Sequence, residues 1–304
     1  MTRIAPDIAA RVRVGIAGWS YADWDGYVYP PGVKDKLRYV APYVDVLEIN
    51  STFYRNPAPR TAASWVRRTA DLPHLAFTAK LNRRITHEQR LTPAIADETR
   101  RALAPLREAG KLRHLLAQFR YDFDDTAEHR ALLERIAEHF RALTAVTLEL
   151  RHRSWQDQGA LSFLDALGIN LATLDYPEAA DSFSLDTSPV GRHAYMRLHG
   201  RNRRAWFSSG AGRDETYNYL YKEPEIDGIL ERIARQAAMS KTLTLVANNH
   251  YQGQEMVNAL EIKARLHGGK LDLPPGLAEQ YPRLRTIAKP AGRPASRWRQ
   301  QELL

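Results

Sequence analysis

The sequence contains no cysteine, so disulfide bonds, thiolate zinc sites, iron–sulfur clusters and cysteine nucleophiles are all excluded. No apolar run approaches the roughly 18 residues that are needed to cross a bilayer. The first thirteen residues lack an apolar stretch long enough for a signal peptide. These absences predict a cytoplasmic protein without a membrane partner.

The composition is that of an ordinary globular protein, with 304 residues, 44% hydrophobic and 26% charged. The length allows two domains, but an α/β barrel commonly uses roughly 250 residues as one domain. The formal net charge of +9 favours an anionic partner, either a small molecule or nucleic acid. The alternative is that the positive charge, which is scattered along the chain, has no role in binding.

Eight short apolar segments alternate with mostly helical connections, and this pattern predicts a parallel sheet. The expected strands are residues 11–17, 44–50, 75–79, 115–119, 145–150, 171–175, 194–198 and 243–247. The expected helices are residues 34–43, 60–70, 94–108, 226–238 and 255–266, one with Leu132, Leu133, Ile136, Phe140 and Leu143 on one face, and one between Ser154 as its N-cap and Gly168 as its end.

Eight strand–helix units in one chain of this size favour a single TIM-type (β/α)8 barrel. No G-x-G-x-x-G follows the first strand, which argues against an open dinucleotide-binding sheet. We therefore expect an N-terminal extension over residues 1–11, a barrel domain over residues 12–285 and a basic, disordered tail over residues 286–304. The connection over residues 177–192 shows little helical period.

Polar side chains follow the apolar part of nearly every strand, where a TIM barrel carries its active site. They are Glu48, Asn50, Lys80, Gln118, Glu149, Arg151, Asp175, Arg197, His199, Asn248 and either Asn249 or His250. Residues two apart on a strand share a face, so these groups are expected to surround one cavity. A structural alternative is an internal salt-bridge network in which Glu48 and Glu149 pair with Arg151, Arg197 and Lys80.

Several short motifs together resemble the YecE-like proteins, domain of unknown function 72. They are residues 18–21 (GWSY), 48–54 (EINSTFY), 85–88 (ITHE), 197–201 (RLHGR) and 248–250 (NNH). The likeness spans roughly residues 12 to 285 and departs from the family pattern at Gln118-Phe119-Arg120. The resemblance implies a TIM-type barrel and the location of a site, but no reaction.

The first functional hypothesis is a hydrolase that acts on a phosphate-bearing or otherwise anionic substrate. Glu48 or Glu149 would be the general base and His199 the acid or an orienting group. The residues expected to bind the substrate are Asn50, Lys80, Gln118, Arg151, Asp175, Arg197, Arg201, Tyr219, Asn248 and Asn249. A short loop that contains glycine, residues 208–213, could add backbone N–H groups, and Glu149→Gln is expected to keep binding but lose turnover.

Three alternatives stay open. A divalent metal could bind Glu48, Glu149, Asp175 and His199, although neighbouring cations would compete with it, so no metal site is assigned and the cofactor stays unknown. A glycosidase would use aromatic side chains such as Trp19, Trp24, Trp155, Trp206 and Tyr219. A non-catalytic module could bind single-stranded nucleic acid through basic loops and aromatic rings. His87, His152 and His250 are expected to be hydrogen-bonded loop residues.

Overall fold

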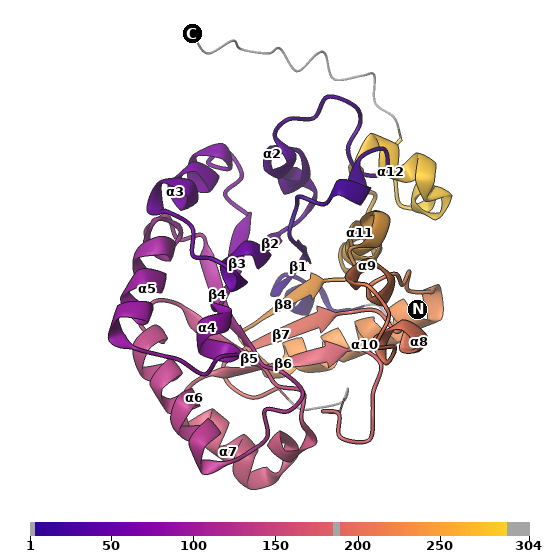
Figure 1. The fold of residues 1–304 in the computed structure, drawn as a ribbon. Coiled ribbons are helices and arrows are strands. Elements are labelled where there is room, and N and C mark those ends of the chain that lie inside the picture. Colours follow the sequence, from indigo (N-terminus) through magenta and orange to yellow (C-terminus); the bar gives the residue numbers. More distant parts are fainter. Residues whose placement is uncertain (1–3, 185–188, 291–304) are drawn as a thin grey trace.

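The computed structural model describes residues 4–184 and 189–290, and it contains eight parallel strands that close into a barrel in chain order. The strands are β1 (Val12–Ala17), β2 (Val46–Ile49), β3 (Ala76–Lys80), β4 (Leu112–Gln118), β5 (Ala145–Glu149), β6 (Asn170–Asp175), β7 (His193–Leu198) and β8 (Thr242–Ala247). Pairing of β8 with β1, in the register Val12 to Leu243, closes the sheet. This confirms the predicted TIM-type barrel, which lies at the centre of Figure 1.

Helices surround the barrel, with α3, α5 and α6 on the left of Figure 1 and α10 and α11 on the right. The α-helices are α1 (Pro6–Ala9), α2 (Lys36–Val40), α3 (Pro59–Arg68), α4 (Arg83–Thr86), α5 (Pro93–Glu108), α6 (Ala127–Phe140), α7 (Gln158–Ala166), α8 (Arg203–Trp206), α9 (Arg213–Thr216), α10 (Glu223–Met239), α11 (Gln254–His267) and α12 (Pro275–Gln280). Short 3-10 helices are η1 (Ala22–Trp24), η2 (Ala41–Tyr43), η3 (Asn50–Phe53), η4 (Arg153–Gln156), η5 (Tyr251–Gly253) and η6 (Pro282–Thr286).

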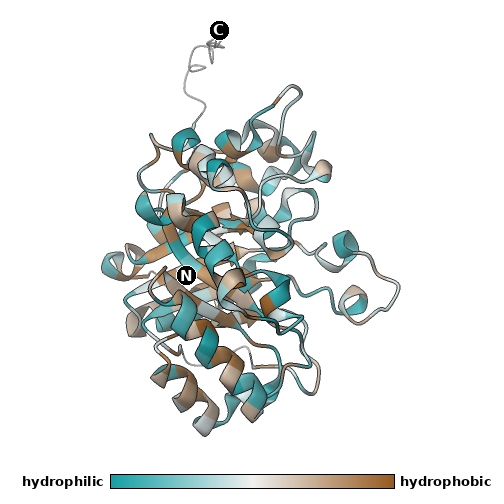
Figure 2. Ribbon diagram, turned by 60° about the vertical axis from the view of Figure 1, so that its left-hand side comes forward, coloured by the Kyte–Doolittle hydropathy of each residue, from teal (hydrophilic) through white to brown (hydrophobic). Residues whose placement is uncertain are grey.

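Hydrophobic periodicity explains the outer layer of helices. In α6, the side chains of Leu132, Leu133, Ile136 and Phe140 are all buried, as their three- and four-residue spacing predicts. Thr126 caps this helix by accepting a hydrogen bond from the backbone N–H of His129. The helices in Figure 2 carry both hydrophilic and hydrophobic residues, because one face packs on the barrel and the other meets solvent.

The inside of the barrel holds a small apolar cluster of its own, separate from the larger core that includes the helices. Its members are Ala17, Val46, Leu116, Ala172, Leu174, Tyr176, Tyr195 and Val246. Because side chains alternate across a strand, Glu48 and Arg197 share a face with Val46 and Tyr195 and continue the barrel interior toward the carboxyl ends of the strands. The interior therefore changes from apolar to charged along its axis.

Several local expectations were wrong or incomplete. Ser154 does not cap α7; it lies in η4, where its Oγ accepts a hydrogen bond from the Asp125 N–H. Gly168 ends α7 as predicted, in a left-handed conformation with φ of 67°. Helix α12 lies beyond the last expected helix.

The two ends of the chain differ from the expected division in detail. Residues 6–9 of the expected extension form α1, which lies against α10 and α11. In the expected tail, Ala288 forms a bridge with Leu271, and residues 291–304 lie outside the described residues. Within the described parts of the 177–192 connection, residues 177–184 and 189–192, no helix occurs. Among the described residues, no helix has the length and apolar character required to span a membrane.

Candidate functional site

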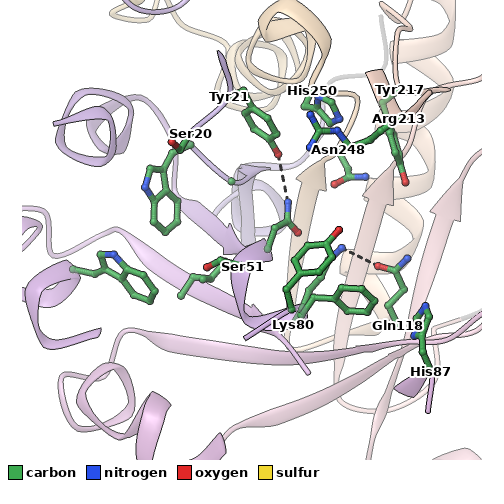
Figure 3. A pocket seen from close by; sticks show the side chains of 17 residues that line it. Ser20, Tyr21, Ser51, Lys80, His87, Gln118, Arg213, Tyr217, Asn248 and His250 are labelled. Carbon is green, nitrogen blue, oxygen red and sulfur yellow. Dashed lines mark hydrogen bonds between the residues drawn. The ribbon is translucent and has the colours of Figure 1, made fainter. Parts of the chain in front are cut away.

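A cavity of about 580 Å³ opens at the carboxyl ends of the strands, where the barrel hypothesis places the active site. Its lining residues are Gly18, Trp19, Ser20, Tyr21, Ile49, Asn50, Ser51, Phe53, Tyr54, Trp65, Lys80, His87, Gln118, Arg213, Tyr217, Asn248 and His250. Four predicted substrate-binding residues are among them, namely Asn50, Lys80, Gln118 and Asn248. Figure 3 shows Lys80 and Gln118 on one side and Tyr21 and His250 on the other.

Lys80 is the last residue of β3, and its side chain reaches into this cavity. Its Nζ donates a hydrogen bond of 2.8 Å to Oε1 of Gln118 and lies 5.7 Å from the centre of the Phe53 ring. In the described part of the chain, no carboxylate lies within ion-pair distance of Nζ, so the expected salt bridge of Lys80 to Glu48 or Glu149 does not form. Burial and the positive charge of Arg197 together lower the pKa of Lys80 to about 8.

Below the cavity, Arg197 is enclosed by carboxylates and has no exposed surface. Its Nη2 donates to Oε1 of Glu48 at 2.6 Å, and its Nη1 donates to Oε2 of Glu149 at 2.5 Å. Arg151 donates to Oε1 of Glu149 at 2.6 Å, and the hydroxyl of Tyr195 donates to Glu48 at 2.9 Å. Glu48, Glu149, Arg151 and Arg197 thus form the internal salt-bridge network that was the structural alternative, and Lys80 is not part of it.

His199 belongs to the same enclosed layer, with Nε2 at 3.5 Å from Oε1 of Glu149. Burial lowers its pKa to about 4, so the imidazole is neutral at physiological pH. Asn248 lines the cavity and contacts both Arg197, at 3.1 Å, and Nδ1 of His199, at 3.1 Å. Asn248 therefore connects the cavity to His199 directly and to Glu48 and Glu149 through Arg197, and none of these three predicted catalytic residues is exposed.

The wall opposite Lys80 is built from rings. The Tyr21 ring stacks on His250 with centroids 4.6 Å apart and an interplanar angle of 8°. Both nitrogens of His250 are buried without a hydrogen-bond partner, so the expectation that this residue is hydrogen-bonded was wrong. His87 and His152 do accept or donate hydrogen bonds, to Thr86 and Ser154 respectively.

Six predicted substrate-binding residues lie outside this cavity: Arg151 and Arg197 belong to the ion network, and four others face the helices and not the barrel interior. Asp175 follows the interior residue Leu174, so strand alternation turns it toward α10, where Nη1 of Arg232 binds it at 2.7 Å. Arg201 binds both carboxyl oxygens of Asp175, at 2.8 and 2.7 Å. The other two residues also bond outside the cavity, Tyr219 to Glu225 and Asn249 to Asn258. The expectation of one shared cavity fails for these four residues.

Arg151 lines a second cavity, of about 510 Å³, beside the first. Its walls include Tyr121, Tyr176, Trp206 and Phe207. The Trp206 ring also contacts Tyr217 of the first cavity, with centroids 5.9 Å apart. The ion network below is therefore approached from two sides, through Asn248 and through Arg151.

Sequence reasoning did not assign Tyr21, His87, Arg213 or Tyr217 to the site. Tyr21 and His87 lie in the motifs at residues 18–21 and 85–88, which offered a signal, whereas Arg213 and Tyr217 follow a long irregular loop. Among residues 4–184 and 189–290, no group of three or more His, Asp or Glu side chains is arranged to hold a metal ion.

Comparison with known proteins identifies relatives of the whole barrel. The model of the family described as "Protein of unknown function DUF72" matches residues 13–281. A curated relative, the UPF0759 protein YunF of Bacillus subtilis, is 26% identical over 83% of this chain and 95% of its own length.

Two solved structures have the same fold. The DUF72 family protein of Thermotoga maritima is 31% identical, with a TM-score of 0.75 over 84% of this chain and 98% of its own. A DUF72 family protein of Enterococcus faecalis is 23% identical, with a TM-score of 0.75 over 86% of this chain and 97% of its own.

Proposed function

The chain belongs to the DUF72 family, and we propose that it is an enzyme that acts on an anionic, phosphate-bearing substrate bound at the carboxyl-terminal mouth of the barrel. The observation that carries the proposal is Lys80, a cation inside the mouth cavity with no carboxylate within ion-pair distance among the described residues. A cation in such a place has its charge available for a ligand. Lys80 is partly buried, and a partly desolvated charge without a partner is costly, so a bound anion would stabilise it.

The other predicted anion-binding residues are already neutralised within the protein. Arg197 pairs with Glu48 and Glu149, Arg151 pairs with Glu149, and Arg201 pairs with Asp175. Recruiting any of them for a substrate would require breaking a buried ion pair. The proposal therefore gives anion recognition to Lys80 and leaves these arginines in the support of the site.

The proposed acid–base groups have to act from below the cavity floor. Glu149 and His199 are enclosed, and Asn248 stands between them and the cavity. We keep the hydrolytic roles of Glu48, Glu149 and His199 as predictions that require Asn248 to move or to relay the interaction. Lys80 is one of the titratable groups that line the cavity, and its pKa of about 8 suits a group that exchanges protons near neutral pH.

Calorimetric titration with inorganic phosphate tests the proposal. Lys80→Met should weaken phosphate binding about 10–100-fold, since a hydrogen bond to a charged group contributes roughly 1.5–3 kcal/mol. Lys80→Arg keeps the charge and should stay within a few-fold of the wild type. Lys289→Met, which removes an exposed surface cation paired with Asp272, is the matched control and should have no effect. Equal phosphate affinity in Lys80→Met and the wild type would overturn the proposal.

A second candidate, a module that binds single-stranded nucleic acid, is favoured by exposed rings at the two cavities. Tyr54 and Tyr121 are 71% and 72% exposed, and Phe207 is 49% exposed. Bases could stack on such rings while phosphates meet nearby cations. Filter binding of single-stranded DNA should then weaken steeply with salt and with Tyr54→Ala or Tyr121→Ala. Absence of any salt-dependent binding would exclude this candidate.

A further inference from the structure

We propose that Lys80 is a covalent nucleophile that forms an imine with the carbonyl group of an anionic aldehyde or ketone held in the mouth cavity. This inference rests on the proposed function and names the substrate class and the chemistry of the same site. It follows from the position of the Lys80 amine at the cavity, from its neighbouring side chains, and from the lack of a carboxylate within ion-pair distance among the described residues.

The surroundings of Lys80 differ from those of the other buried or paired lysines. Lys263 forms an ion pair of 2.7 Å with Asp45. Lys111 is enclosed near the start of β4, where Nζ donates to the carbonyl oxygens of Leu72 and Leu75. Lys80 has one hydrogen bond, to the neutral amide of Gln118, and it faces a cavity. An amine with a single neutral partner is free to rotate toward a ligand.

The electrostatic environment favours the neutral, reactive form of this amine. Burial and the nearby guanidinium of Arg197 lower the pKa of Lys80 to about 8, and Glu48 and Glu149 only partly oppose them. Roughly one amine in ten is then neutral one pH unit below that value. A lysine that is desolvated and next to another cation is the usual form of an imine-forming residue.

The same surroundings suit a substrate that carries a negative charge. At Lys80 the positive charges of Arg197 and Arg151 are opposed by those of Glu48 and Glu149, whereas Arg213, whose partner Asp214 is exposed, lies at the cavity wall. The negative group would be held by Arg213 while the carbonyl carbon meets Nζ. Lys80 lines the cavity together with Phe53 and Gln118, which are the neighbours of its Nζ.

Imine formation requires only the amine and the carbonyl compound, with protons exchanged with solvent. The lone pair of the neutral amine attacks the carbonyl carbon, and the electrons of the C=O π bond move to oxygen, which takes a proton. The nitrogen loses one proton, and the oxygen of the resulting carbinolamine takes a proton from solvent, so that the C–O bond breaks and water leaves. The nitrogen lone pair forms the C=N bond at the same time, which gives a cationic imine, and loss of one proton from this cation returns the proton to solvent and gives the neutral imine. One carbonyl compound and one amine thus yield one imine and one water.

Reductive trapping tests this inference. The intact protein is incubated at neutral pH with pyruvate and borohydride, digested, and analysed by mass spectrometry. Lys80 should gain the mass of pyruvate less one oxygen atom, faster than Lys111 and faster than surface lysines such as Lys289. Excess inorganic phosphate should slow this labelling, and lactate, which lacks the carbonyl group, should give none.

Lys80→Arg separates this inference from the proposed function. The variant keeps a positive charge at position 80, so its phosphate affinity should stay within a few-fold of the wild type, while trapping at position 80 is lost because a guanidinium does not form an imine under these conditions. Wild-type protein that binds phosphate but labels Lys80 no faster than the surface lysines would overturn the inference alone. Wild-type protein that fails to bind phosphate would overturn the proposed function, and labelling of Lys80 that phosphate does not slow would remove the anionic substrate from the inference.

Discussion

Arg197 shows how individual residues set the character of this barrel. Its guanidinium is fully buried and bonds to Glu48, Glu149 and Asn248. Although burial alone would raise the pKa of Glu149, the guanidinium groups of Arg197 and Arg151 hold it well below its ordinary value. The carboxylate of Glu149 is therefore ionised in the folded protein at every pH of physiological interest.

Glu149→Gln should consequently cost stability as well as any activity. The substitution leaves Arg151 without a carboxylate and Arg197 with only one, so we expect a loss of about 3–5 kcal/mol in the free energy of unfolding at neutral pH. Glu98→Gln, which breaks the surface pair with Arg84, should cost less than about 1 kcal/mol. Denaturant unfolding of the two variants measures the difference, and equal losses would contradict the account.

The pH dependence of that loss has a definite sign. A lowered folded-state pKa contributes stability that is present above the unfolded value of 4.5 and is lost as pH falls through the folded pKa. The stability difference between the wild type and Glu149→Gln should therefore shrink as the protein is acidified below pH 4.5.

Glu255 in α11 is the opposite case. It is completely buried, and among the described residues no cation lies within ion-pair distance of it. Burial raises its pKa well above the ordinary value, and the charge of Glu48 adds to this, while a backbone interaction with Ala17 opposes it. The folded protein therefore holds Glu255 protonated at pH values where the unfolded chain does not.

Glu255→Gln should mimic this protonated form without its pH dependence. Wild-type stability should decline as pH rises from 4.5 toward the raised folded pKa, because the unfolded state releases the proton first. At mildly alkaline pH the variant should be at least as stable as the wild type, and the two should converge below pH 4.5. Thermal unfolding of both proteins across this pH range is the measurement. A stability of the variant relative to the wild type that falls as pH rises would contradict the prediction.

At the scale of residues, the sequence predicted the polar strand ends but not all of their directions. Asn50, Lys80 and Gln118 reach the cavity as expected. Asp175 does not reach the cavity. The register of each strand decides which of its side chains point into the barrel, and a shift of one residue turns every side chain to the opposite face. Which cation would stay unpaired was not predictable either, since it depends on distances across the barrel.

At the scale of elements, the pairing of β1 with β2 leaves no room for a side chain at Gly15. Gly15 is paired with Val46, and a Cβ at Gly15 would lie 1.8 Å from the Val46 carbonyl oxygen. A side chain there cannot be accommodated by rotamer changes, because the obstacle is backbone. The pairing of these two strands therefore requires glycine.

Gly15→Ala should destabilise the protein by about 3 kcal/mol or more, because it forces two paired strands apart. Gly228→Ala in α10 is the matched control, because nothing lies within 4 Å of the added Cβ. This change should stabilise the helix by about 0.5–1 kcal/mol. Denaturant unfolding of both variants measures the two effects. An unchanged free energy of unfolding in Gly15→Ala would contradict the account.

Element existence was predictable where apolar periodicity was strong, as in α6 and all eight strands. The ends of the elements and the shortest helices were not predictable from the sequence. Ser154 reads as a helix cap, but its hydroxyl bonds to Asp125 of a neighbouring loop, a contact that is distant in sequence. Helices α8 and α9, in the loop after β7, are each only four residues long and carry no periodic signal.

At the scale of the whole molecule, closure of the barrel gathers every strand end at one rim. Eight strand–helix repeats and the absence of a dinucleotide-binding motif sufficed to predict this topology, because parallel neighbours require crossovers and few arrangements satisfy eight of them. The net charge of +9 indicated an anionic partner but not its location. We propose the location from the ion pairs, which leave Lys80 without a carboxylate partner among the described residues.

The pH dependence of phosphate binding tests that central claim most directly. Lys80 carries its charge below a pKa of about 8 and loses it above, so calorimetric affinity for inorganic phosphate should fall as pH rises through 8. Lys80→Arg should retain its affinity across the same range, because the guanidinium stays protonated. Wild-type affinity that is unchanged through this range, or that falls equally in Lys80→Arg, would contradict the account.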